Sequence, residues 1–124
     1  MNLIISNSSN TPIYEQIKEQ IKNKILSNEL KTGELLPSIR SLAKDLRISV
    51  ITTKNAYEEL ERDGYVETIP GKGTYVANKN KEIIREEQLQ KVEGLLDTAV
   101  SIAKLSNITK KEIQEMLDIL YEEE

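Results

Sequence analysis

The chain has 124 residues, a formal net charge of −4 at pH 7, and neither cysteine nor histidine. Without cysteine there is no disulfide framework and no thiolate metal site, and without histidine the commonest general base and transition-metal ligand are missing. We therefore expect neither an enzyme nor a cofactor nor a metal site. The length suits one compact domain with an appendage, and the absence of tryptophan and phenylalanine requires an aliphatic core.

Charge is unevenly distributed along the sequence. Residues 1–30 are net neutral, residues 31–81 carry +2, and residues 82–124 carry −6. The acidic side chains are thus concentrated near the C-terminus, so the acidic total does not exclude an anionic partner for the middle segment. No stretch approaches the ~20 apolar residues of a membrane span, and the N-terminal apolar run is too short for a signal peptide. We expect a cytoplasmic protein with no membrane partner.

Residues 11–27 have the pattern of an amphipathic helix. Isoleucine recurs at every fourth position from Ile13 to Ile25, Thr11 can cap the helix, and Pro12 suits the first helical position. Residues 28–33 form a connection in which Gly33 can supply a positive φ.

A second helix is expected near residues 37–46 and a third over residues 49–63, with only Arg47 and Ile48 between them. Two helices joined by so short a turn are either a generic helical corner or a DNA-binding helix-turn-helix. In the second case the third helix is the recognition helix, and its N-terminal residues lie at base edges. Those residues are Ser49, Val50, Ile51, Thr52, Thr53 and Lys54.

The chemistry of these residues suits DNA. Ser and Thr hydroxyls hydrogen-bond bases or phosphates, and Val50 or Ile51 can meet a thymine methyl group. Ser49 can also serve as a plain helix cap, which does not exclude a phosphate contact. Arg40, in the first turn of the second helix, has no carboxylate four residues away, so it can clamp a phosphate or reach a guanine. The alternative for Arg40 is a solvated surface arginine.

Residues 65–69 and 74–77 are β-compatible and flank a bend, which predicts a hairpin. Lys72 lies between Gly71 and Gly73 in that bend. The glycines permit close backbone approach and the lysine supplies charge, which suits a wing (residues 70–74) at the DNA backbone or minor groove. Alone, the same tripeptide is a common surface hairpin tip.

After Asn78 the sequence predicts a long amphipathic helix over residues 80–105, a break, and a last helix opened by a capping box at Thr109–Glu112. A helix hairpin cannot bury two apolar stripes by itself, so we expect it to form a homodimer. The alternative is that its stripe packs onto the N-terminal part of its own chain. No pocket for a small-molecule effector is evident. The predicted dimerisation residues are Leu89, Val92, Leu95, Leu96, Ala99, Ile102, Ala103, Ile113, Met116, Leu117 and Leu120.

The combined motifs resemble the GntR family of winged-helix bacterial transcription regulators, and Pro12–Ile17 is similar to its short YtrA-type branch. The resemblance covers about residues 3–77. It implies a mostly α fold with a small β-hairpin wing, in which a winged helix-turn-helix domain (1–78) precedes a two-helix dimerisation hairpin (79–124). The matching residues are Gly33, Leu36–Arg40, Leu42–Ala43, Ser49, Thr52–Thr53, Ala56–Tyr57, Leu60, Gly64–Val66 and Gly71–Val76.

The resemblance also implies a function, namely a homodimeric repressor on an inverted-repeat operator. The chain departs from the family at Val50 and Ile51, where an arginine or another polar residue often follows the capping serine, so no operator sequence is carried over. The competing hypothesis is a winged helix used for protein–protein assembly, whose basic face is incidental. The full set of predicted DNA-binding residues is Ser38, Arg40, Ser49, Val50, Ile51, Thr52, Thr53, Lys54, Tyr57, Lys72, Gly73 and Thr74.

Overall fold

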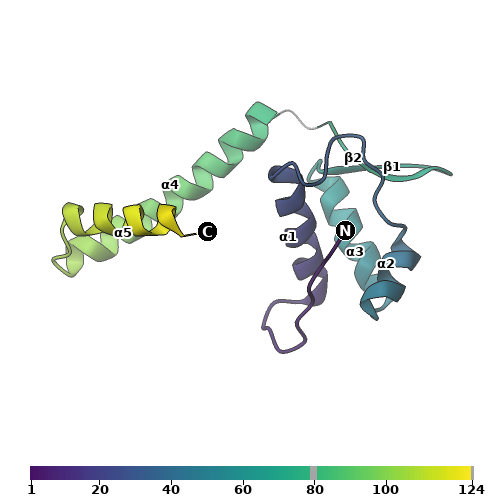
Figure 1. The fold of residues 1–124 in the computed structure, drawn as a ribbon, viewed down its shortest axis with the longest axis horizontal. Helices are drawn as coiled ribbons and strands as arrows, with labels where there is room; N and C mark the ends of the chain where they lie inside the picture. The colour runs from purple at the N-terminus through teal and green to yellow at the C-terminus, as the bar shows by residue number, and fades with distance from the viewer. Residues whose placement is uncertain (79–80, 124) are drawn as a thin grey trace. The chain divides into compact units, whose positions relative to one another are not determined.

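The computed structural model describes residues 1–78 and 81–123, and the chain divides into two compact units between residues 79 and 80. We call the first unit the head and the second the tail. The head contains three helices and a two-stranded antiparallel sheet, and the tail contains two helices (Figure 1). This architecture confirms the predicted fold class. The expected start of the tail helix at Asn80 lies outside the described residues.

The first helix of the head, α1, spans Ile13–Leu26, and its isoleucines at positions 17 and 21 are completely buried. The cap expected from Thr11 is wrong. Pro12 is the N-cap residue and no side chain caps the helix. Instead, Gln16 closes the first turn, because its backbone N–H donates to Pro12 O and its side-chain amide donates to Thr11 O.

Two glutamines one turn apart on α1 hold the N-terminal segment. The Gln20 amide accepts the Ile4 N–H at 2.8 Å and donates to Ile4 O at 2.7 Å. Gln16 makes the same pair of bonds with Ser6, both at 2.9 Å. Each side-chain amide thus satisfies both the N–H and the C=O of one residue in the N-terminal segment, as a neighbouring β-strand would. Held in this way, the segment packs Leu3 against the core. The sequence did not predict this arrangement.

Helices α2 (Ile39–Leu46) and α3 (Val50–Arg62) agree closely with the predicted pair. Ser38 and Ser49 are their N-cap residues, and each hydroxyl accepts the backbone N–H three residues on. Arg47 ends α2 in the left-handed region, with φ 56° and ψ 48°. Arg47 and the Ser49 cap reverse the chain within the tight turn that the sequence predicted.

The hairpin comprises β1 (Val66–Ile69) and β2 (Gly73–Val76). Residues 33–36, which the sequence assigned partly to a connection, pair with the other edge of β2. The Leu36 N–H donates to Thr74 O at 2.8 Å, and the Gly33 N–H donates to Val76 O at 2.8 Å. Gly33 has the expected positive φ. This third backbone segment ties the hairpin to the chain entering α2, so the wing does not stand alone.

One continuous core joins all the elements of the head. As the composition required, it is aliphatic apart from two tyrosines. The buried members of this cluster are Ile17, Ile21, Leu30, Leu36, Leu42, Ala56, Tyr57, Leu60, Tyr65, Val66 and Val76.

The tail consists of α4 (Lys81–Leu105) and α5 (Lys110–Glu122). The predicted capping box is confirmed: Thr109 Oγ1 accepts the Glu112 N–H at 3.2 Å, and the Glu112 carboxylate accepts the Thr109 N–H at 2.7 Å. Asn107 turns the chain with φ 57°. Over residues 1–78 and 81–123, none of the helices combines the length and apolar character of a membrane span.

Candidate nucleic-acid interface

The first turn of α3 presents apolar and basic side chains to solvent. Val50 is 40% exposed and Ile51 is 71% exposed. Lys54, also exposed, lies one turn further on with its Nζ 3.7 Å from Glu58 Oε1. A contact between two such exposed groups holds the lysine only weakly. The end of the helix that the sequence assigned to base recognition is therefore accessible.

The hydroxyl groups of this turn are engaged with one another. Ser49 Oγ accepts the Thr52 N–H and lies 2.7 Å from Thr52 Oγ1. Ser49 is exposed and Thr52 is half-buried. The cap role of Ser49 is thus present in the free protein, and its remaining hydrogen-bonding capacity is open to a phosphate.

Three residues predicted to contact DNA have buried side chains that bond within the protein, so the structure offers no free side-chain group at these positions. Thr53 is 0% exposed and donates to Ser49 O at 3.2 Å. Tyr57 is 3% exposed and donates to Pro37 O at 2.7 Å, and burial raises the pKa of Tyr57 above its ordinary value of 10. Thr74 is 8% exposed, with its hydroxyl 3.0 Å from that of Thr68. These groups hold α2, α3 and the hairpin in place.

Helix α2 contributes exposed cations. Arg40 is exposed, and within residues 1–78 and 81–123 it has no ion-pair partner, as its sequence neighbours suggested. Lys44 and Arg47 are exposed as well, although the sequence reading passed over them. Asp45 is the only acidic residue between positions 38 and 54. The helix-turn-helix is therefore locally basic in an acidic chain.

Asn55 is a further candidate that the sequence reading missed. It is exposed on α3, four residues after Ile51, so the two side chains share one face of the helix. The four-residue spacing from Ile51 is the feature of the sequence from which Asn55 could have been predicted.

Lys72 lies in the hairpin turn at the tip of the wing, between two glycines. Gly71 and Gly73 have φ values of 77° and 122°, and the Lys72 N–H donates to Ile69 O at 2.9 Å. The backbone conformation at Gly73 favours glycine, whereas a Cβ there would meet only Leu35 Cδ1, at 2.9 Å, which belongs to an exposed side chain that can shift. The Lys72 side chain is exposed at the turn.

Acidic groups at the other end of α3 are drawn into structural contacts. Lys18 on α1 lies 3.0 Å from Asp63 Oδ2 and 3.2 Å from Glu59 Oε1. Its hydrogen bonds to Asp63 and Glu59 raise the pKa of Lys18. Glu61 accepts the Thr68 N–H at 2.7 Å, which anchors β1. The N-terminal end of α3 is thus basic and exposed, whereas acidic side chains at its C-terminal end contact Lys18 of α1 and the backbone of β1.

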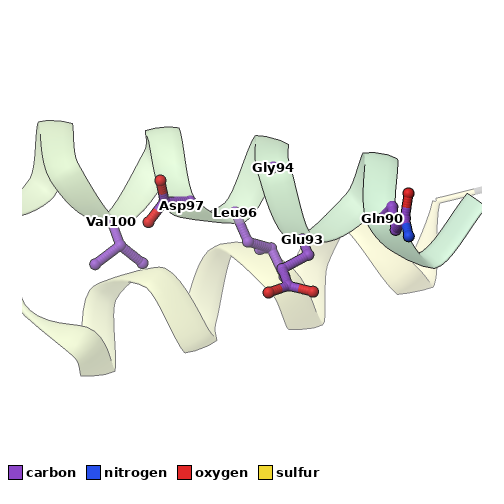
Figure 2. A pocket seen from close by; sticks show the side chains of 6 residues that line it. All are labelled: Gln90, Glu93, Gly94, Leu96, Asp97 and Val100. Atoms are coloured by element: carbon purple, nitrogen blue, oxygen red, sulfur yellow. The ribbon is translucent and has the colours of Figure 1, made fainter.

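The tail leaves its apolar residues uncovered within one chain. Of the predicted dimerisation residues, Ala103 is buried, Ile113 is half-buried and the other nine are exposed. Leu96 and Val100 point from α4 toward α5, yet they are 43% and 40% exposed (Figure 2). They line a hollow of about 580 Å³ whose walls all come from α4. This is an open groove on one helix rather than an enclosed ligand cavity.

Comparison with known families decides the identity of the fold. Residues 13–76 match the family described as bacterial regulatory proteins, gntR family. The chain belongs to the GntR family. The resemblance stated from the motifs is thereby confirmed, and members of the family are transcription regulators rather than enzymes, as expected.

The similarity extends beyond the head. The chain is 35% identical over 109 residues to the HTH-type transcriptional repressor YtrA of Bacillus subtilis, covering 88% of this chain and 84% of that one. A transcriptional regulator from Oenococcus oeni superposes with a TM-score of 0.76 at 26% identity, covering 94% and 97% of the two chains. The AraR DNA-binding domain, solved in complex with operator ORR3, gives a TM-score of 0.53 at 25% identity over 62% of this chain and 93% of that one.

Proposed function

We propose that this GntR-family regulator is a homodimeric repressor that binds an inverted-repeat operator. Each protomer places the N-terminal turn of α3 in a major groove and Lys72 beside the adjacent backbone or minor groove. The observation that carries the proposal is the exposed first turn of α3 within a basic helix-turn-helix, where Arg40 has no competing carboxylate among the described residues.

The electrostatics support the DNA part of the proposal. Cations at α2 and the wing provide the phosphate contacts that supply most of the affinity and orient a protein on a duplex. The similar AraR domain is described as bound to an operator, which agrees with the same use of this fold.

The tail supports the dimer part of the proposal. Nine predicted dimerisation residues are exposed in one chain, and the groove on α4 has an apolar wall at Leu96 and Val100. A second copy would cover both and bring two heads to one operator, with α4 setting their separation and hence the half-site spacing. The name repressor given to the B. subtilis relative supports occlusion of a promoter as the mode of action.

The test is binding of the full chain to a labelled duplex of its own upstream promoter region, beside a scrambled duplex, across a salt series. We expect saturable preference for the promoter and a steep negative salt slope, with ~0.9 in the slope for each phosphate contact. Weak binding that is equal on both duplexes would contradict operator recognition on that promoter. No binding at low salt to either duplex would favour the protein-assembly function.

Arg40→Ala sharpens this test. We expect it to weaken promoter binding by about 1–3 kcal/mol, with the promoter preference reduced if Arg40 reads a base and retained if it holds a phosphate. Lys31→Ala is the matched control, because Lys31 is an exposed cation outside the helix-turn-helix. Equal affinity of Arg40→Ala and wild type would remove Arg40 from the interface.

A further inference from the structure

Ile51 is the most exposed large apolar residue of the helix-turn-helix, at 71%, and its neighbour Val50 follows at 40%. The other apolar residues of α3 are buried, with Ala56 and Leu60 at 0% and Tyr57 at 3%. A single exposed apolar side chain is ordinary on a protein surface. Here two adjacent ones occupy the turn that the proposed function places in the major groove.

The polar groups of the same turn are already committed. The Ser49 and Thr52 hydroxyls bond each other, the Ser49 hydroxyl also caps the helix by accepting the Thr52 N–H, and the buried Thr53 hydroxyl donates to Ser49 O. A hydroxyl engaged in this way has less capacity to discriminate bases. The exposed methyl groups of Ile51 are therefore the groups of this turn that are most available to contact a base edge.

The major groove presents one apolar group, the C5-methyl of thymine. We propose that Ile51 recognises that methyl group, so that each operator half-site has an A·T pair beneath the first turn of α3. The inference rests on the proposed function and names the base that this site selects. Asn55 points to the same pair type, since it shares the exposed face of α3 with Ile51 and an amide pairs with adenine.

The experiment removes the methyl group without changing base pairing. Duplexes that bind the full wild-type chain are first selected from a random library. Each thymine of the selected sequence is then replaced in turn by deoxyuridine, and affinities are measured for wild type and Ile51→Ala. We expect one thymine in each half-site whose replacement weakens wild-type binding about fourfold, as for loss of one buried methyl.

Ile51→Ala is expected to lose that sensitivity, so that its affinities for the thymine and deoxyuridine duplexes agree. Ile4→Ala is the matched control, because Ile4 is 82% exposed in the segment held by α1, outside the helix-turn-helix. It should keep the fourfold effect. Because both duplexes are compared within each variant, a general change in folding or affinity cancels.

Two results would overturn the inference, and they are distinguishable. If a preferred sequence emerges but no thymine replacement weakens binding, or Ile51→Ala retains the full effect, thymine recognition by Ile51 is wrong and operator binding stands. If the selection yields no preferred sequence at any salt concentration, sequence-specific DNA binding itself fails, and the inference fails with it.

Discussion

The head and the tail differ in how completely they bury the apolar faces of their helices. Both are built from amphipathic helices, yet Ile17, Ile21 and Leu60 of the head are 0% exposed, whereas Leu95 and Leu120 of the tail are 73% and 62% exposed. Three helices and a hairpin surround a core on several sides, while two helices leave their outer apolar faces uncovered. The difference shows that the core of the head closes within one chain, whereas the tail leaves apolar side chains exposed, which the proposed second copy would cover.

This contrast has a thermodynamic counterpart. A unit whose core closes within one chain has a free energy of unfolding that does not depend on protein concentration. A unit stabilised by a second copy gains stability by mass action, so its melting temperature rises with concentration. The effect of a mutation on stability should therefore be independent of protein concentration in the head and dependent on it in the tail.

The largest effect is expected from Leu60→Ala. Leu60 is completely buried, so truncation removes apolar contacts and leaves a cavity, which destabilises the head by about 2–5 kcal/mol. Leu105→Ala is the matched control at a position that is 88% exposed, with an expected change of at most about 0.5 kcal/mol. Urea denaturation of both variants checks the pair. A loss at Leu105 as large as that at Leu60 would mean that a partner buries Leu105.

Leu96→Glu tests the other side of the comparison. Because Leu96 would be covered by the second protomer, a carboxylate there should cost about 1.5–3 kcal/mol per protomer in dimer stability and shift the protein towards monomer. Sedimentation across a concentration series measures the shift. Leu105→Glu, at the more exposed position, should remain dimeric. A sedimentation profile of Leu96→Glu that matches wild type would refute the assignment of this face.

The burial of Tyr57 should make the free energy of unfolding of the head depend on pH. Burial raises the pKa of Tyr57 in the folded state above the ordinary 10, so the unfolded chain releases the phenol proton first. The contribution of Tyr57 is therefore complete below about pH 10 and is lost above it, by up to about 1.4 kcal/mol per pH unit.

Urea denaturation between pH 8 and 11 checks this prediction. Tyr57→Phe should be less stable than wild type at pH 8, by about 1 kcal/mol, because Pro37 O loses its donor. The difference should shrink as the pH rises past 10, since phenylalanine cannot ionise in the unfolded chain. Tyr121→Phe, at a position that is 89% exposed, controls for the loss of one phenol. A constant difference across the range would contradict the burial argument.

Much of the fold could be predicted because its signals are local. Ser49 and Thr109 cap helices as expected, since capping depends on residues within one turn. The tight turn at Arg47 and the positive φ of Gly33 were likewise evident from neighbouring residues.

The errors arose where a partner distant in the sequence decides the outcome. Thr53 lies in α3, but only the packed structure shows that its side chain is completely buried. The pairing of residues 33–36 with β2 and the glutamine bonds to the N-terminal segment also join distant positions. A list of candidate contacts taken as a continuous run therefore included buried residues and omitted Asn55, which lies further along the exposed face.

The smallest effect is expected at Arg47, where the head stores local backbone strain. Its φ of 56° is costly for a residue with a Cβ, so Arg47→Gly should stabilise the head by about 0.5–1 kcal/mol after the added flexibility of glycine is counted. Asn28→Gly is the matched control, because asparagine tolerates its φ of 66°. Arg47→Ala removes the charge without relieving the backbone. If Arg47→Ala and Arg47→Gly raise the melting temperature equally, repulsion among the cations of the helix-turn-helix, and not the conformation of the turn, limits the stability of the head.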